Sequence, residues 1–154
     1  GGGYPVQITG EEPSIEEIGE SIKTQMGAIP ENILVIAEPG RYLVGSAGCL
    51  VTKVVGVASR DDGRWVYLDS GIYGGLMELI DDFPATIISE RVGELAEWTV
   101  AGPTCDAIDV MGRHWLPANT QVDDFIYMPN MGAYCASCTT HFNGFPPPVI
   151  QMVE

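Results

Sequence analysis

Apolar residues at helical spacing mark the first predicted element, between residues 12 and 28. Four of them recur at intervals of three or four positions: Ile15, Ile18, Ile22 and Met26. Ser14 and Glu17 have the spacing of a capping box, in which two side chains bond backbone N–H groups reciprocally at a helix start. The pattern predicts an amphipathic helix over residues 12–28, whose isoleucine and methionine side chains belong to a core.

A nearly continuous apolar run follows at residues 32–37 (NILVIA). Such a run is typical of a strand that is buried on both faces of a parallel sheet. Glu38 and Arg41 come soon after it, and in barrel enzymes the sites are built at that end of a strand. A short helix is predicted from Arg41 to about Gly48.

From about residue 50 the pattern changes to short β segments with few helical signals. Residues 51–58 and 65–69, joined by an Asp-Asp-Gly turn at 61–63, predict a hairpin. Further strands are predicted at residues 86–89, 97–101, 123–128 and 148–153. We therefore expect residues 50–154 to form an antiparallel β-sandwich or barrel-like C-terminal domain.

The predicted fold class is thus α/β followed by all-β. Residues 1–49 supply at most two strands, whereas a closed (β/α)8 barrel has eight. We interpret residues 1–49 as the last strands and helices of such a barrel, and residues 132–154 as a segment that the two domains can exchange. The opening Gly-Gly-Gly without an initiating Met indicates a processed, nicked or excised piece. The other barrel strands are then expected from another polypeptide or from a removed part.

Composition excludes some classes of partner. With 154 residues and 45% hydrophobic content, the chain can bury one modest core. Seven basic and twenty-one acidic residues give a net charge of −14, which argues against nucleic acid and anionic membranes and is compatible with cationic small molecules. The sequence has no apolar run long enough to span a membrane and no charged-then-apolar leader. We therefore expect a cytoplasmic protein with no membrane partner. Four cysteines do not make a disulfide scaffold in a chain of this length.

A thiol and a carboxylate stand side by side in the segment Gly102–Asp106 (GPTCD). Gly and Pro predict a tight bend there, on a loop that presents Cys105 and Asp106. The alternative for the same five residues is a turn without a chemical role, capped by the Asp106 side chain. A chemical role would need a proton acceptor or a cation near the thiol.

Two other segments have the chemistry of anion binding. Gly1–Pro5 is a glycine-rich loop whose N–H groups can approach an anion, or else a flexible remnant. Arg41 offers a planar set of donors suited to phosphate, and Glu38 offers a carboxylate, although the two can also form an internal ion pair. The pair Cys135 and Cys138 has no second pair and no suitably spaced His, so no metal site is predicted.

Four blocks in order, EPGRY at 38–42, GPTCD at 102–106, GAY at 132–134 and FNGF at 142–145, resemble one enzyme family. They are similar to the pyridoxal-phosphate-dependent ornithine/lysine decarboxylases of the alanine-racemase-like class, the group IV decarboxylases. The match extends to GGGYP at 1–5, DSGIYG at 69–74 and the following Asp82. It covers nearly the whole chain but only the C-terminal part of such an enzyme.

The resemblance implies pyridoxal 5'-phosphate as cofactor and a small basic L-amino acid as substrate, with ornithine or lysine converted to putrescine or cadaverine. Glu38 would face the pyridine nitrogen of the cofactor. The residues implied to grip its phosphate are Gly1, Gly2, Gly3, Gly40, Arg41 and Tyr134.

The resemblance also implies substrate residues. Asp82 and Asp106 would bind the distal ammonium, and Cys105 would protonate Cα after carbon dioxide leaves. Tyr73, Cys105 and Asp106 would reach across a head-to-tail dimer into the neighbour's site, and Phe142 would pack near the cofactor and that interface. Asp81 stands where an aromatic residue is expected, so the length of the substrate stays open.

The lysine that holds the cofactor as a Schiff base has no match in this chain. Lys23 and Lys53 are its only lysines, and neither lies in a block that resembles the family's lysine motif. An N-terminal barrel fragment or subunit is therefore expected to supply it, in a homodimer or a dimer of heterodimers with shared active sites.

Two alternatives remain at this point. One is a non-catalytic, decarboxylase-like regulatory or binding protein, which would be expected to lose the cofactor residues. The other is a diaminopimelate decarboxylase-like enzyme, in which the Cys block carries Glu in place of Asp106.

Overall fold

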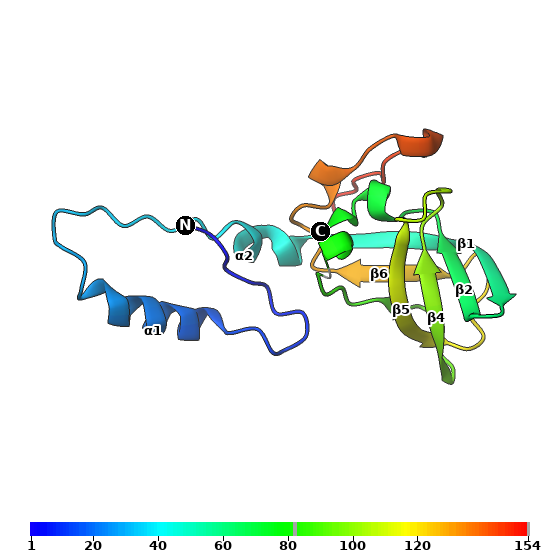
Figure 1. Cartoon of the computed structure of the whole chain (residues 1–154), viewed down its shortest axis with the longest axis horizontal. Helices are drawn as coiled ribbons and strands as arrows, with labels where there is room; N and C mark the ends of the chain where they lie inside the picture. Colours follow the sequence, from blue (N-terminus) through cyan, green and yellow to red (C-terminus); the bar gives the residue numbers. More distant parts are fainter. Residues whose placement is uncertain (82, 154) are drawn as a thin grey trace.

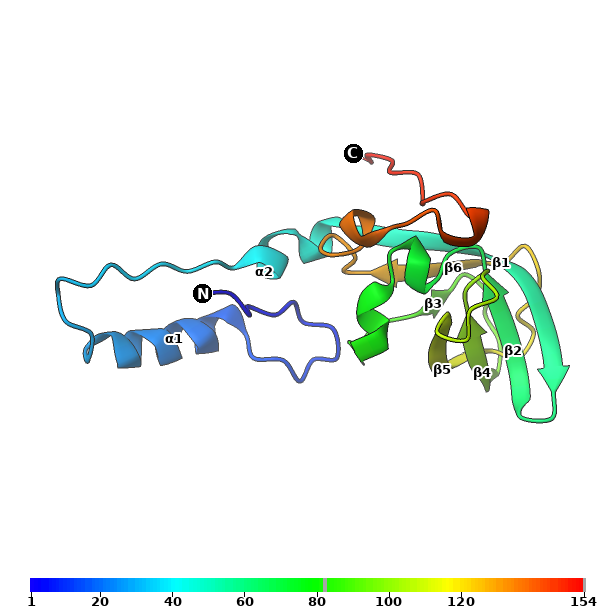
Figure 2. The ribbon, with the colours of Figure 1, turned by 45° about the horizontal axis from the view of Figure 1, so that its top comes forward.

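The computed structural model describes residues 1–81 and 83–153. A curled six-stranded sheet forms the body of the molecule, and residues 1–39 extend away from it as long loops with one helix (Figures 1 and 2). The order of a helical N-terminal part and a β-rich C-terminal part agrees with the predicted fold class. Within residues 1–81 and 83–153 no (β/α)8 barrel forms, and no helix has the length and apolarity to cross a membrane.

Helix α1 (Ile15–Met26) begins with the predicted capping box. The Ser14 hydroxyl accepts the Glu17 N–H at 3.2 Å, and the Glu17 carboxylate accepts the Ser14 N–H at 2.8 Å. The expectation of a buried apolar face is wrong for this chain, because no residue of α1 is buried and Met26 is 47% exposed. No described element covers that face.

The strand predicted at residues 32–37 is also absent. Residues 32 and 33 lie in a turn, residues 34–37 have no strand partner among the described residues, and the side chains are open, with Leu34 82% exposed. The Ile33 N–H bonds the nearby Pro30 carbonyl at 3.0 Å, and the distant partner is Gly1, whose amine donates to the Ile36 carbonyl at 3.1 Å and whose carbonyl accepts the Glu38 N–H at 2.8 Å. A strand needs a ladder of such bonds, which a single residue does not supply.

The sheet has the strand order β3-β6-β1-β2-β4-β5. The strands are β1 (Cys49–Arg60), β2 (Gly63–Leu68), β3 (Ile88–Ser89), β4 (Leu95–Ala101), β5 (Val110–Pro117) and β6 (Phe125–Pro129). Helix α2 (Gly40–Val44) precedes the sheet. Together with the 3₁₀-helix that follows it, α2 matches the short helix predicted before β1. The 3₁₀-helices are η1 (Gly45–Ala47), η2 (Ile72–Gly74), η3 (Met77–Asp81), η4 (Ala136–Cys138) and η5 (Phe142–Gly144).

The predicted β1–β2 hairpin is confirmed, but the sheet is mixed rather than antiparallel. Strands β2 and β4 pair in parallel, from Arg64 opposite Trp98 to Tyr67 opposite Ala101. Between them the chain passes through η2, η3 and β3 at the far edge of the sheet and returns in the same direction. A single curled sheet therefore takes the place of the expected sandwich.

The structure has one strand that was not predicted and lacks one that was. Strand β5 was not predicted, because Gly112, with φ of 85°, and exposed polar residues interrupt its apolar alternation. The strand predicted at 148–153 is absent, and Val149 there is 92% exposed. Proline at the start of that segment lacks the N–H that a ladder requires, and no described strand lies beside it.

The core lies on one face of the sheet. Alternate residues of four strands have no exposed surface, among them Val54, Val66, Leu68, Val100, Ile126 and Met128. Ile72 of η2, Leu76 and Cys135 pack into the same cluster. The core thereby fixes the two non-strand segments that carry Tyr73 and Tyr134 against the sheet.

Candidate active site

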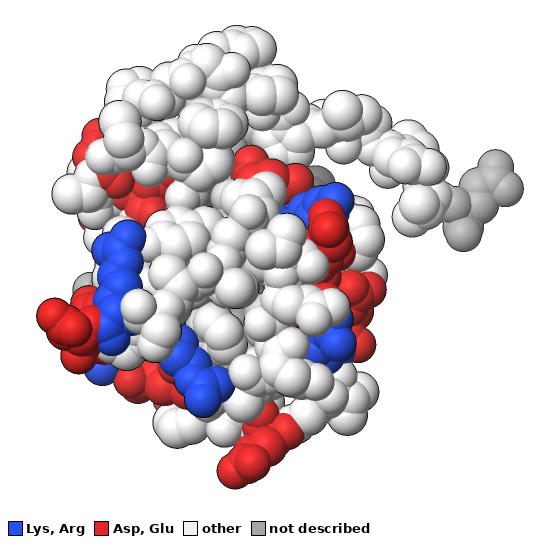
Figure 3. Space-filling view, turned by 90° about the vertical axis from the view of Figure 1, so that its right-hand side faces the viewer, with Lys and Arg blue, Asp and Glu red and all other residues white. Residues whose placement is uncertain are grey.

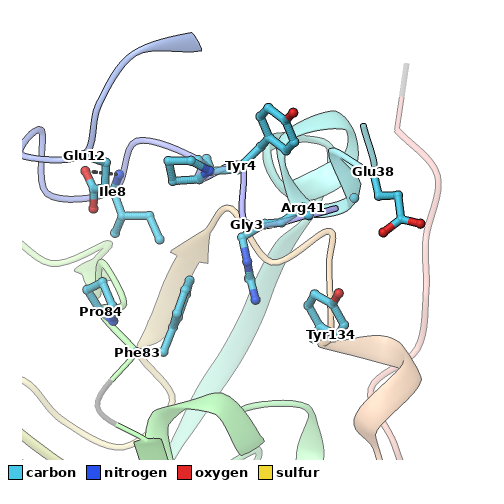
Figure 4. Close-up of a pocket in the computed structure, with 13 residues that line it drawn as sticks. Gly3, Tyr4, Ile8, Glu12, Glu38, Arg41, Phe83, Pro84 and Tyr134 are labelled. Carbon is cyan, nitrogen blue, oxygen red and sulfur yellow. Dashed lines mark hydrogen bonds between the residues drawn. The ribbon is translucent and has the colours of Figure 1, made fainter. Parts of the chain in front are cut away.

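A pocket of about 400 Å³ lies where the N-terminal loop meets the start of α2 and the segment before η4 (Figure 4). Six of the seven predicted cofactor residues line it: Gly2, Gly3, Glu38, Gly40, Arg41 and Tyr134. Gly1 is not among the lining residues, and its backbone instead bonds residues 36 and 38. With Phe83 and Pro84, which also line it, segments from four distant parts of the sequence converge on one cavity.

Arg41 extends into this pocket between two aromatic rings (Figure 4). Its guanidinium carbon lies 4.3 Å from the Phe83 ring centroid and 4.9 Å from the Tyr134 ring centroid. A third contact is an ion pair with the Glu78 carboxylate of η3. Because the guanidinium is planar, these three neighbours fix its orientation and leave its other N–H groups for an anion.

The alternative of an internal Glu38–Arg41 ion pair is not what the structure shows. Arg41 bonds Glu78, and the Glu38 carboxylate and the Arg41 guanidinium point in different directions (Figure 4). Glu38 makes no side-chain hydrogen bond to the described residues. Its carboxylate is therefore available to a ligand.

A close backbone contact brings Tyr134 to Arg41. The Gly132 N–H donates to the Gly45 carbonyl at 2.9 Å, and a Cβ at Gly132 would stand 1.8 Å from the Val44 carbonyl oxygen. Only glycine fits this contact with the end of α2. The glycine of the GAY block thus docks Tyr134 beside the arginine of the EPGRY block.

The glycine-rich loop completes the pocket wall. A Cβ at Gly2 would lie 3.1 Å from the Glu38 carbonyl oxygen, and Gly3 has φ of 90°, a conformation that favours glycine. Backbone N–H groups, a guanidinium and the Tyr134 phenol form a donor set for a phosphate, while the Glu38 carboxylate suits a cationic ring nitrogen. The residues present therefore fit pyridoxal phosphate.

A second group contains the predicted substrate residues. The Tyr73 hydroxyl donates to Asp106 Oδ2 at 2.6 Å, and the Tyr73 ring stacks on Phe142 with centroids 4.2 Å apart. This hydrogen bond, together with the Ile108 N–H, lowers the pKa of Asp106 below its ordinary value, and the bond to the Asp106 carboxylate raises the pKa of Tyr73. Asp106 Oδ1 accepts the Ile108 N–H at 3.0 Å, so the same side chain also closes the predicted turn.

Cys105 lies in this group with an exposed thiol. The Asn143 amide is its neighbour, with Nδ2 at 3.5 Å and Oδ1 at 3.8 Å from the sulfur. Asn143 has φ of 60°, a left-handed conformation that Asn tolerates better than most residues. The η5 segment therefore turns an amide toward the thiol.

The structure brings most predicted residues into these two groups, with Gly1 outside the lining of the pocket. Asp82 lies outside the described residues. Sequence reasoning missed Glu78, Phe83 and Asn143, although Asn143 stands inside the FNGF block. Glu78 stands between apolar residues in the segment MELID, and this was the only sign of it in the sequence.

The remaining thiols and charges are arranged as follows. Cys135 is buried, and its burial raises the pKa of its thiol, while Cys138 is partly exposed at the end of η4. The described residues contain no group of three His, Cys, Asp or Glu side chains placed to hold a metal ion. On the face shown in Figure 3, basic side chains are scattered among acidic ones rather than gathered in a patch.

Comparison with known proteins points to one family. Residues 33–132 match the family model described as the C-terminal sheet domain of pyridoxal-dependent decarboxylases. A lysine/ornithine decarboxylase of Selenomonas ruminantium is 34% identical over 149 residues, which cover 94% of this chain and 37% of that enzyme. The chain thus spans less than two fifths of that relative's length.

Solved structures agree in fold. The crystal structure of lysine/ornithine decarboxylase complexed with cadaverine from Vibrio vulnificus has a TM-score of 0.84 and 35% identity, over 95% of this chain and 40% of that one. Diaminopimelate decarboxylase from M. jannaschi has a TM-score of 0.81 and 27% identity, over 93% and 34% of the two chains. The chain therefore belongs to the pyridoxal-dependent decarboxylase family, of which it contains the C-terminal sheet domain.

Proposed function

We propose that this chain is the C-terminal part of a pyridoxal-phosphate-dependent decarboxylase that acts on ornithine, lysine or both. The observation that carries the proposal is the single pocket in which Glu38, Arg41 and Tyr134 converge with the glycine-rich loop. Anion donors and a free carboxylate in one cavity suit a cofactor that has a phosphate at one end and a ring nitrogen at the other.

Each pocket residue has a defined task in this proposal. Pyridoxal phosphate, when bound, supplies an electron sink for the charge left at Cα. Arg41, Tyr134 and the backbone of Gly2 and Gly3 hold its phosphate, and Glu38 keeps a proton on the ring nitrogen. Phe83 covers the guanidinium and excludes water from one side of Arg41.

The second group handles the substrate. Asp106, with Asp82, binds the distal ammonium of the substrate. A substrate with a neutral side chain would leave these acids unpaired, so the pair gives specificity for a diamino acid. Cys105 delivers a proton to Cα, with Asn143 holding the thiol in place. Tyr73 donates a hydrogen bond to Asp106, which favours the ionised carboxylate and holds its direction.

The proposal includes partners. The lysine that binds the cofactor comes from an N-terminal barrel part, to which residues 1–49 belong. The enzyme is a head-to-tail dimer in which the Tyr73, Cys105 and Asp106 group serves the neighbour's site. The cofactor pocket and the Tyr73, Cys105 and Asp106 group are separate within this chain, which supports the proposal that they serve different active sites of the dimer. A cytoplasmic location stays a prediction.

Asp106 supports ornithine and lysine over diaminopimelate, despite the shared fold. The ground is the identity of the acid: this chain has Asp106 after the cysteine, whereas the Cys block of a diaminopimelate decarboxylase-like enzyme is expected to carry Glu there. Retention of Glu38, Arg41, Cys105 and Tyr134 supports an enzyme over a non-catalytic relative.

The test is an assay of the full-length protein, with carbon dioxide release measured from ornithine, lysine and diaminopimelate. We expect release from at least one of the first two and its loss, together with retained cofactor absorbance, in Cys105→Ala. Glu38→Gln and Arg41→Ala should weaken cofactor retention. Activity on diaminopimelate alone, or cofactor binding that is unchanged in both pocket variants, would contradict the proposal.

A further inference from the structure

Asp109 is a buried acid between the two loops that carry the second group of residues. One loop, residues 69–75, presents Tyr73, and the other, residues 102–106, presents Cys105 and Asp106. Asp109 immediately precedes β5, and only 1% of its surface is exposed. It touches none of the pocket residues.

The Asp109 side chain binds both loops. Oδ1 accepts the Ile72 N–H at 2.8 Å, and Oδ2 accepts the Thr104 N–H at 3.0 Å and the Thr104 hydroxyl at 2.7 Å. Its backbone adds two bonds, from the Gly102 N–H at 2.9 Å and to the Asp106 carbonyl at 3.0 Å. A buried carboxylate with three donors is fully paired, so removing it would leave those donors unsatisfied.

Glycines on both loops make room for this carboxylate. A Cβ at Gly71 or at Gly102 would stand 2.2 Å from Asp109 Oδ1. Any larger residue would push the loops away from the acid and from each other. The same buried carboxylate therefore requires glycine both at Gly102, which opens the GPTCD block, and at Gly71 of DSGIYG.

We infer that Asp109 is a positioning residue that clamps the Tyr73 loop to the Cys105–Asp106 loop. The clamp sets the Tyr73–Asp106 hydrogen bond and the direction of the Cys105 thiol. The inference rests on the proposed function only for the chemistry given to Cys105 and Asp106. The contact between Tyr73 and Asp106 can be measured without any activity.

The test variant is Asp109→Asn in the full-length enzyme. It keeps the shape of the side chain but turns an NH₂ group toward N–H and O–H donors. The Tyr73 hydroxyl, followed by NMR of ¹³C-labelled tyrosine and identified with Tyr73→Phe, should titrate at lower pH than in the parent protein. Loss of the Asp109 charge contributes to this shift directly, and Thr104→Ala, which keeps that charge, isolates the contribution of the clamp. We expect kcat to fall about 10- to 100-fold because the loop shifts, with cofactor affinity changed less than about twofold.

Asp124→Asn is the matched control. Asp124 is another buried acid, 3% exposed, but it bonds Arg91 and the Gln121 N–H, which lie on neither loop. It should lower the denaturation midpoint as Asp109→Asn does, while the Tyr73 titration and kcat stay unchanged. Equal effects of the two variants on Tyr73 would show a general loss of stability and overturn the inference.

A milder variant covers the case in which Asp109→Asn does not fold. Thr104→Ala removes one of the three donors and should shift the Tyr73 titration in the same direction by a smaller amount. An unchanged titration there overturns the inference. If the parent enzyme decarboxylates no basic amino acid, the proposed function fails, but the Tyr73 titration still decides the role of Asp109.

Discussion

Arg41 and Glu78 form an ion pair between α2 and η3, and the two residues are 37 positions apart in the chain. The pair occupies one edge of the guanidinium that is proposed to hold a phosphate. Since the Glu78 charge opposes a phosphate at the same arginine, it should weaken anion binding.

Glu78→Gln is therefore expected to strengthen phosphate binding. The amide keeps an acceptor for Arg41 but removes the charge, so affinity for pyridoxal phosphate should rise about 3- to 10-fold at low salt. Fluorescence titration of the full-length apoenzyme measures this. Glu97→Gln, which removes an exposed acid paired with Arg113 on the sheet, should leave the affinity unchanged. Weaker binding in Glu78→Gln would show that the charge mainly orients Arg41.

Gly132→Ala should destabilise the protein and displace Tyr134. The added methyl would stand 1.8 Å from the Val44 carbonyl oxygen, so the backbone must shift, at a cost of about 1–3 kcal/mol. Urea denaturation measures the change. Gly19→Ala is the control, because no atom lies within 4 Å of its added methyl and alanine favours the helix by about 0.5–1 kcal/mol. A neutral Gly132→Ala would contradict the contact.

The four cysteines should differ in reactivity. Cys105 is exposed, whereas Cys135 is buried and its raised pKa keeps the thiol protonated. Alkylation with iodoacetamide at pH 8, followed by peptide mass spectrometry, should modify the exposed Cys49 and Cys105 first and the buried Cys135 last. Excess ornithine or lysine should slow the reaction of Cys105. Faster alkylation of Cys135 than of Cys105 would argue against this arrangement of the thiols.

The Tyr73–Asp106 hydrogen bond should depend on pH at both ends of the scale. The pKa of Asp106 is lowered in the folded protein, so its contribution to stability is present above the unfolded value near 3.9 and is lost as pH falls through the folded value. The pKa of Tyr73 is raised, so its contribution is complete below about 10 and is lost as pH rises through the folded value. In Tyr73→Phe the Asp106 carboxyl, followed by ¹³C NMR, should titrate at higher pH. An unchanged Asp106 titration would exclude the bond.

Sequence signals that depend on near neighbours predicted local structure well. The Ser14–Glu17 capping box, the turn at 61–63 and the bend after β4 all appear, because each is stabilised within a few residues. The pairing of β2 with β4 could not be predicted, since strand direction depends on the path of the 26 residues between Leu68 and Leu95. The strand expected at 32–37 failed for the same reason: an apolar run becomes a strand only beside a partner.

The residues of the candidate site were named from the sequence, but the contacts between them were not. The blocks identified Glu38, Arg41, Tyr134, Tyr73 and Asp106, which the structure places in two groups. Glu78 and Asp109 escaped notice because their partners are distant in sequence and no motif marks them. A buried acid is recognised only once its donors are known in space.

The unpartnered segment at residues 33–36 has a practical consequence. Its backbone N–H and C=O groups and its exposed Ile33, Leu34, Val35 and Ile36 form the kind of edge through which chains aggregate by adding strands to one another. The polypeptide produced alone should therefore self-associate at high concentration, and co-expression with the N-terminal barrel part proposed above should keep it dispersed.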